Sequence, residues 1–218
     1  GRFADDEILL CDWSSDVCSS DLITASVENR NLFIETIADI AEGIEIPFTV
    51  GGGIRTVQDI KRLLEVGVDK VSISSAAIKN PALIKEAADR FGSKRIVFAM
   101  DVKQVSDDGW HVFSNGGQVD TGIDAIEWAM KGEELGAGEI VVNSIDADGI
   151  KDGYDITLTR QVAESVSIPV VASGGAGKME DFYLALTDGK ADAALAASVF
   201  HYDEIQIKDL KAYLNSKL

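Results

Sequence analysis

The sequence is poor in cysteine and in basic residues, and it has no long apolar run. Its two cysteines, Cys11 and Cys18, could form a disulfide or be incidental, but their scarcity favours a reducing, cytoplasmic setting over a disulfide scaffold. Lys and Arg number 20 against 37 Asp and Glu, so the formal charge is −17. That balance argues against a nucleic-acid partner, because phosphate backbones are bound by clustered cations. No apolar stretch reaches the roughly 18 residues that a membrane span needs, and residues 1–20 do not resemble a secretory signal.

The composition is that of an ordinary globular protein, with 46% hydrophobic and 26% charged residues in a chain of 218. This length suits a single domain over residues 1–218. The acidic charge does not exclude small phosphorylated ligands, because backbone N–H groups at helix starts bind phosphate without side-chain charge.

Residues 12–22 read DWSSDVCSSDL, and their composition, rich in serine and aspartate, differs from that of the remainder of the chain. One interpretation is a polar surface loop. The string also resembles the in-frame translation of a common sequencing-library adapter, which would make residues 12–22 an artefactual insert and both cysteines foreign. On that interpretation the genuine sequence resumes near Ile23.

Short β-rich runs alternate with amphipathic helical stretches from residue 29 onward, which predicts βα units and a parallel sheet. The expected strands are Glu7–Leu10, Phe48–Val50, Lys70–Ile73, Ile96–Asp101, Glu139–Ser144, Pro169–Ser173 and Ala191–Ala196. The expected helices are Asn31–Ala41, Val57–Val66, Pro81–Phe91, Ala125–Leu135, Ile156–Ser165, Met179–Thr187 and Ile207–Asn215. Thr56 and Asn80 are predicted to cap their helices with their side chains.

The chain also repeats itself: Ile46-Pro47 recurs as Ile168-Pro169 (168 − 46 = 122), and Gly52-Gly53 recurs at the same offset as Gly174-Gly175. Two similar halves of this size predict a (β/α)8 TIM barrel of two four-stranded half-barrels. A doubly wound open sheet is the alternative, but it leaves the duplication unexplained. Because only seven strands can be placed, we expect the first strand and its helix to be missing at the N-terminus.

Glycine turns and small polar strand ends mark two candidate phosphate sites. Such turns let backbone N–H groups approach an anion, and two copies predict two phosphates on opposite sides of the barrel mouth. The first copy comprises Gly51 to Gly53 with Ser74 and Ser75, and the second comprises Gly174 and Gly175 with Ala197 and Ser198.

Carboxylates end two of the predicted strands. Asp101 closes an apolar strand and is expected to point into the mouth as a general acid–base group, with a helix cap or an ion pair to Lys103 as the alternative. Asp146 could hydrogen-bond substrate hydroxyls, and the Asp148-Gly149 turn could close over a phosphate. No residues at metal-ligand spacing join them, so we expect neither a metal nor a cofactor.

Charged residues precede three of the strands, at the end of the barrel opposite the mouth. Glu7, Lys70 and Glu139 could be solvated strand starts or a ring of charges around the barrel axis. The two histidines, His111 in a predicted β-ribbon and His201 after the last strand, are expected to be structural.

Five segments together resemble the cyclase subunit of imidazole glycerol phosphate synthase, from histidine biosynthesis. They read TVGGGIR, DKVSISSAA, GAGEIVVNSIDADGIKDGYD, SGGAGKMEDF and ADAALAASVFHY. The resemblance implies a barrel that takes ammonia from a glutaminase partner in a heterodimer. It also implies closure of an imidazole ring in a bis-phosphorylated substrate, which yields imidazole glycerol phosphate and an aminoimidazole carboxamide ribotide.

The resemblance also implies residue roles. Asp101 matches one of two catalytic aspartates, whereas the second, with a nearby lysine, has no match in this sequence. Implied phosphate and substrate contacts are Gly53, Ser74, Ser75, Asp146, Asp148, Gly149, Ser173, Gly175, Ala197 and Ser198. Glu7, Lys70 and Glu139 match an ammonia gate, and Asp69 matches a position that faces the glutaminase.

Three departures from the family pattern stand out: Val102 after Asp101, Ser74 where asparagine is common, and Leu22 in place of an aspartate. Two other functions stay open at this point. The sister isomerase of the same pathway would use two aspartates and two phosphates without ammonia, and a non-catalytic barrel would only bind phosphorylated ligands or the glutaminase.

Overall fold

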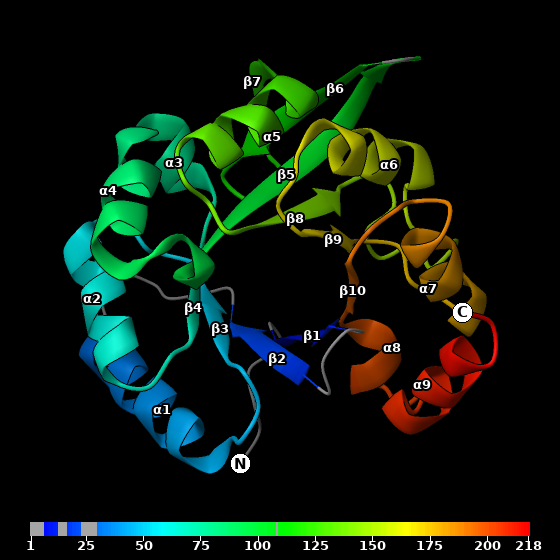
Figure 1. The fold of residues 1–218 in the computed structure, drawn as a ribbon, viewed down its shortest axis with the longest axis horizontal. Coiled ribbons are helices and arrows are strands. Elements are labelled where there is room, and N and C mark those ends of the chain that lie inside the picture. Colours follow the sequence, from blue (N-terminus) through cyan, green and yellow to red (C-terminus); the bar gives the residue numbers. More distant parts are fainter. Residues whose placement is uncertain (1–6, 13–16, 23–29, 108) are drawn as a thin grey trace.

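The computed structural model describes the backbone of residues 7–12, 17–22, 30–107 and 109–218, and the side chains within these ranges from Ile34 onward. Eight of the described strands form one continuous path, β2-β1-β10-β9-β8-β5-β4-β3. These strands are β1 (Glu7–Asp12), β2 (Val17–Leu22), β3 (Thr49–Gly51), β4 (Lys70–Ile73), β5 (Ile96–Ser106), β8 (Glu139–Ser144), β9 (Val170–Ser173) and β10 (Ala193–Ala196). The strands lie inside a ring of helices, and β2 lies beside β3, so the path curls into a barrel (Figure 1).

Most of this barrel is parallel, as the alternation of strands and helices predicts. The ladders β3–β4, β4–β5, β5–β8, β8–β9 and β9–β10 are all parallel. The fold is therefore α/β with a curled parallel sheet, consistent with the (β/α)8 TIM barrel.

The N-terminal strands correct two expectations. The run Glu7–Leu10 does form a strand, but β1 pairs antiparallel with both β10 and β2. Residues 17–22, which lie within the segment expected to be foreign, form an eighth strand instead of a loop. Only residues 13–16 connect the two strands, and a connection this short permits antiparallel but not parallel pairing. Since β1 is reversed, β2 runs in the same direction as β3 and β10.

The helices lie on the outside of the barrel (Figure 1), and apolar side chains of strands and helices pack together between the two layers. They are α1 (Arg30–Gly43), α2 (Val57–Glu65), α3 (Ser75–Lys79), α4 (Ala82–Phe91), the short 3-10 helix Ser93–Arg95, α5 (Ala125–Glu134), α6 (Ile156–Ser165), α7 (Met179–Leu186), α8 (Ser198–His201) and α9 (Ile207–Asn215). The seven predicted helices are confirmed within a few residues, while α3 and α8 were not predicted as elements.

Helix caps follow the sequence at one predicted position and not at the other. Thr56 Oγ1 accepts a hydrogen bond from Asp59 N, and the Asp59 carboxylate accepts one from Thr56 N, which makes a capping box for α2. The predicted Asn80 cap is wrong, because Pro81 is the N-cap residue of α4 and makes no side-chain cap bond. The Asn80 backbone carbonyl accepts from Leu83 N instead.

Alternation along β5 separates the core from the barrel interior. Phe98 and Met100 pack into the large cluster between strands and helices. Val97 belongs to a smaller cluster with residues of β8, β9 and β10, against which Ala99 packs. Because strand side chains alternate, Asp101 follows Val97 and Ala99 on the interior face, at the carboxyl end of the parallel part of the strand.

A β-ribbon extends from the barrel rim. The distal part of β5 pairs with β6 (Gly109–Ser114), which pairs with β7 (Val119–Asp124), both antiparallel. This confirms the ribbon that the sequence predicts around His111. Asn115 and Gly116, in the turn between β6 and β7, lie at the barrel mouth, where Asn115 N donates a hydrogen bond to Ser75 Oγ.

Candidate active site

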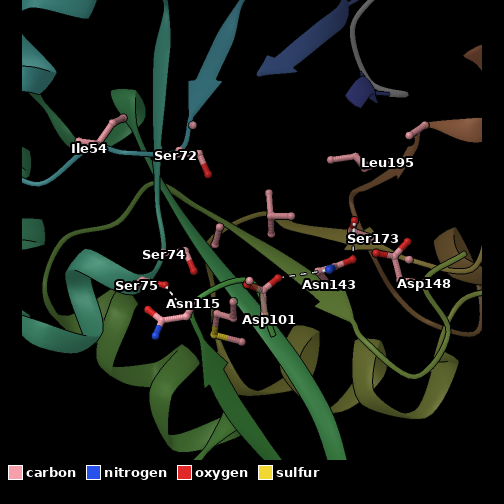
Figure 2. A pocket seen from close by; sticks show the side chains of 18 of the residues that line it. Ile54, Ser72, Ser74, Ser75, Asp101, Asn115, Asn143, Asp148, Ser173 and Leu195 are labelled. Carbon is pink, nitrogen blue, oxygen red and sulfur yellow. Dashed lines mark hydrogen bonds between the residues drawn. The ribbon is translucent and has the colours of Figure 1, made fainter. Parts of the chain in front are cut away.

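A cavity of about 730 Å³ opens at the carboxyl ends of the parallel strands. This is the end at which barrel enzymes carry their active sites. Of the residues predicted for the site, the following line it: Gly53, Ser74, Ser75, Asp101, Asp148, Gly149, Ser173, Gly174, Gly175, Ala197 and Ser198. Figure 2 shows the polar side chains from both halves of the chain around one space.

Asp101 lies in this cavity and is mostly shielded from solvent. Burial raises the pKa of its carboxyl above the ordinary value, and the nearby Asp148 charge raises the pKa further. A hydrogen bond from Asn143 Nδ2 to Asp101 Oδ1, 3.2 Å long, acts against this rise. The described partner of Asp101 is therefore Asn143, not the Lys103 that the alternative interpretation of the sequence named.

Asn143 links Asp101 to the neighbouring strand β9. Its side-chain oxygen accepts a hydrogen bond of 3.1 Å from Ser173 Oγ, while its amide nitrogen donates to Asp101 (Figure 2). Asn143 was not among the residues predicted for the site. Its position two residues after Val141 on β8 is the signal that could have found it, since residues at that spacing share the interior face.

The first glycine turn and the start of α3 form one side of the cavity. Gly52 and Gly53 have φ values of 82° and 67°, a left-handed conformation that favours glycine. Ser74 Oγ is buried and has no hydrogen-bond partner among the described residues. Ser75 Oγ accepts a 3.1 Å hydrogen bond from Asn115 N in the ribbon turn. A buried hydroxyl without a partner carries a desolvation cost that a ligand oxygen can remove.

The second glycine turn faces the first. A Cβ on Gly174 would lie 2.7 Å from the Ser144 carbonyl oxygen, and a Cβ on Gly175 would lie 2.1 Å from the Gly153 carbonyl oxygen. Gly153 N also donates to Gly175 O over 2.8 Å. Only glycine allows this approach, so the turn after β9 is held against the loop after β8, which carries Asp148 and Gly149.

Asp146 is the one predicted cavity residue that the structure places elsewhere. Its Oδ2 accepts a 2.8 Å hydrogen bond from Gln104 N on β5, and it does not line the cavity. The carboxylate thus ties the loop after β8 to the base of the ribbon.

The end of the barrel opposite the mouth carries three of the four predicted charged residues, Lys70, Glu139 and Asp69. Lys70 Nζ lies 2.6 Å from Glu139 Oε2, and Glu139 Oε1 is buried with no partner among the described residues. Asp69 Oδ2 accepts a 2.8 Å hydrogen bond from Phe48 N. The predicted position of Glu7 is wrong: β1 runs antiparallel to β10, with Leu9 opposite Ala196, so the first residue of β1 lies at the mouth end of the barrel and not beside Lys70 and Glu139.

Neither histidine lines the cavity. His111 Nδ1 lies 3.1 Å from Asp120 Oδ1 within the ribbon, and the His201 ring contacts Tyr202 edge-on. Within the described ranges no cluster of three or more His, Cys, Asp or Glu side chains could hold a metal ion. In the same ranges no helix is both long and apolar enough to cross a membrane.

Three cationic side chains in the cavity wall were also missed by the sequence analysis. Arg55 and Lys79 follow the first glycine turn and the first small-residue strand end, and Lys151 lies in the loop after β8. They are scattered along the chain, so no local pattern marks them, and only the folded barrel brings them together.

A curled parallel α/β sheet with a polar cavity at the carboxyl ends of its strands has the architecture of a (β/α)-barrel enzyme. The family model described as "Histidine biosynthesis protein" matches residues 19–206. The chain is also 58% identical, over 196 residues, to imidazole glycerol phosphate synthase subunit HisF of Lachnoclostridium phytofermentans. That match covers 89% of this chain and 76% of the relative. The chain therefore belongs to the histidine biosynthesis protein family, and the resemblance found in its motifs is confirmed.

Proposed function

We propose that this chain is the cyclase subunit of imidazole glycerol phosphate synthase. Its substrate is the bis-phosphorylated ribulosyl-formimino aminoimidazole carboxamide ribotide, which reacts with ammonia to give imidazole glycerol phosphate and aminoimidazole carboxamide ribotide. The observation that carries the proposal is the cavity in which two opposed glycine turns flank a partly buried carboxylate, Asp101. A relative of 58% identity named as a subunit of this synthase supports it.

Each half of the barrel holds one phosphate in this proposal. Gly53, Ser74 and Ser75 bind the first, and the Ser74 hydroxyl, which has no partner in the described part of the chain, donates to a phosphate oxygen. Gly149, Gly175, Ala197 and Ser198 bind the second, and Ser173 and Asp148 contact the substrate between them. Backbone N–H groups at such turns supply donors that do not depend on side-chain charge.

Asp101 serves as a general acid–base group on the reacting part of the substrate. Its raised pKa brings the carboxyl closer to the working pH, where a group can both release and recover a proton. Asn143 keeps one carboxylate oxygen oriented, so the other oxygen is directed to the substrate.

The charged end of the barrel is the ammonia entrance in this proposal, and a glutaminase subunit docks over it. Lys70 and Glu139 form an ion pair there, and the buried Glu139 Oε1 has no partner among the described residues. Asp69, directly before β4 and beside Lys70, belongs to the partner face. The working complex is a heterodimer in the cytoplasm.

We further infer that residues 1–218 form one barrel domain and that residues 12–22 are a foreign insert, supported by their adapter-like sequence. Resequencing the source DNA across codons 1–25 tests this inference. Recovery of a different coding sequence there supports an insert, and recovery of the same codons from independent DNA contradicts it.

The cyclase proposal is tested by incubating the bis-phosphorylated substrate with ammonium salt and following imidazole glycerol phosphate. Because the second catalytic aspartate has no match here, the assay is run on this chain and on a version preceded by the first strand of the HisF relative. Ammonium-dependent product formation by the extended version supports the cyclase. Isomerisation of the aldose precursor without ammonium identifies the sister isomerase, and phosphate binding without turnover by either version identifies a binding barrel.

A further inference from the structure

The loop after β8 carries Lys151, whose backbone is held in place by packing. Its ammonium group forms an ion pair with a partly exposed glutamate, which another anion can replace. Lys151 has φ 64°, and a Cβ on Gly177 would lie 2.0 Å from the Lys151 carbonyl oxygen, so the loop packs backbone to backbone against the turn after β9. Lys151 itself lines the cavity beside Gly149.

The Lys151 ammonium group is held from the segment between α8 and α9. Its Nζ lies 2.6 Å from Glu204 Oε1 and 5.8 Å from the centre of the Tyr202 ring. The two paired side chains are 35% and 43% exposed. Ion pairs with this much exposure contribute little net free energy, so a stronger anion can displace the glutamate.

The second half of the cavity needs a cation for a phosphate. Arg55 and Lys79 follow β3 and β4 on the first half, whereas Lys151 is the cationic residue lining the cavity from the described part of the second half. Asp148 lines the cavity close by in the same loop, and its negative charge opposes a bound anion. A phosphate monoester carries about −1.5 to −2 charges and three acceptor oxygens, against a single charge on Glu204.

We propose that Lys151 is a binding residue for the second phosphate, restrained by Glu204 and Tyr202 until the phosphate monoester of the substrate takes over its ammonium group. This inference rests on the proposed function. It adds to it a cation that binds the second phosphate, Lys151, and an anion that competes with the phosphate for that cation, Glu204. Lys151 donates charge-assisted hydrogen bonds to the phosphate, and Glu204 turns toward solvent when the pair opens.

Two substitutions separate these roles because they act in opposite directions. In Lys151→Met the side chain keeps its length without the charge, and the affinity of the second site for glycerol phosphate falls about tenfold. In Glu204→Gln the competitor loses its charge, and the affinity rises roughly two- to fivefold.

The measurement is a glycerol phosphate titration of the full chain at low ionic strength, followed by amide NMR. The Gly175 and Ser198 amides report the second site, and the Gly53 and Ser75 amides report the first. A matched control is available in Lys190, which also has a positive φ (56°) and pairs with Glu164 over 2.5 Å. Because Lys190 precedes β10, it lies at the opposite end of the barrel, and Lys190→Met is expected to leave both sites unchanged.

The outcomes are distinct for the two proposals. Second-site affinity that is unchanged in Lys151→Met, while the wild-type chain binds at both sites, overturns this inference and leaves the cyclase proposal standing. An equal loss of second-site affinity for glycerol phosphate in Lys151→Met and Glu204→Gln also overturns it, because the ion pair would then only hold two loops together. Absence of any shift in the wild-type chain counts against the phosphate sites themselves, and this inference falls with them.

Discussion

The Asp101 carboxylate has an unfavourable desolvation free energy in the fold, but it supplies an acid–base group to the cavity. Its carboxylate sits at the end of an interior strand row, where burial disfavours the charged form. A purely structural residue at this position would be apolar, like Val97 and Ala99 before it. The carboxylate is thus explained by chemistry and not by packing.

Replacing Asp101 by Asn removes the proton-transfer group while keeping its shape. We expect Asp101→Asn to lower ammonium-dependent turnover by about 10²-fold or more in the extended version of the chain. The substrate KM should change little, because the phosphate sites are untouched. Turnover within a factor of two of the unsubstituted protein would remove Asp101 from the mechanism.

The neighbours of Asp101 should move its titration in opposite directions. Asn143→Leu keeps the bulk but removes the hydrogen bond that lowers the pKa, so the Asp101 pKa should rise further. Asp148→Asn removes a charge that raises it, so the pKa should fall. If ionised Asp101 is the base, the acidic limb of the pH–rate profile moves up in pH for the first variant and down for the second.

Carbon NMR of the Asp101 carboxyl group measures these shifts without any turnover. Lys190→Met, at the far end of the barrel, serves as a variant that should leave the titration in place. Shifts of the same sign in Asn143→Leu and Asp148→Asn would contradict the opposite effects assigned to these two neighbours.

At the scale of elements, helix starts show where local sequence and structure agree. Thr56 and Asp59 form reciprocal bonds that satisfy backbone N–H groups at the start of α2. Asn80 looks equally suitable in the sequence, but Pro81 occupies the N-cap position of α4. The choice between these two arrangements depends on how the chain leaves α3, which the local sequence does not encode.

The two positions make a matched pair of stability tests. Thr56→Ala should lower the free energy of unfolding by about 1 kcal/mol, the usual cost of losing an N-cap. Asn80→Ala should change it by less than about 0.5 kcal/mol, because no side-chain bond is lost. Urea denaturation of both variants measures the difference, and equal losses would contradict the assigned caps.

At the scale of the whole molecule, closure of the barrel depends on its N-terminal hairpin. Only seven strands could be placed from the sequence, whereas in the structure β1 pairs with β10, and β2, an eighth strand of the path, lies beside β3. The hairpin therefore pairs with the edge of β10 and lies beside the edge of β3, the two strands that would otherwise be exposed.

Deletion of residues 1–22 should uncover these edges. In a chain of this size each 1 kcal/mol lost lowers Tm by roughly 2–4 °C, and we expect a fall of roughly 10 °C together with binding of a hydrophobic dye. Differential scanning calorimetry of the deleted and full chains makes the comparison. An unchanged, cooperative melt would show that the remaining strands are stable without the hairpin.

Several features of the protein follow from the sequence by itself. The hydrophobic periodicity predicts the first and last residues of α6 and α9 correctly. The internal repeat predicts a barrel with two opposed glycine turns. These signals are local or repeated, so they can be found before the chain is folded. The family also follows from contiguous motifs, since each stays together in the sequence.

Other features exist only in the folded molecule. Asn143 reaches Asp101 because β5 and β8 pair in register, with Asp101 opposite Asn143, although they lie far apart in the sequence. Lys151 meets Glu204 because two loops far apart in the sequence pack together, and the Asp146 carboxylate accepts a hydrogen bond from Gln104 N instead of lining the cavity. The sequence determined which residues could carry the chemistry, and only strand register and loop packing decided which of them share one cavity.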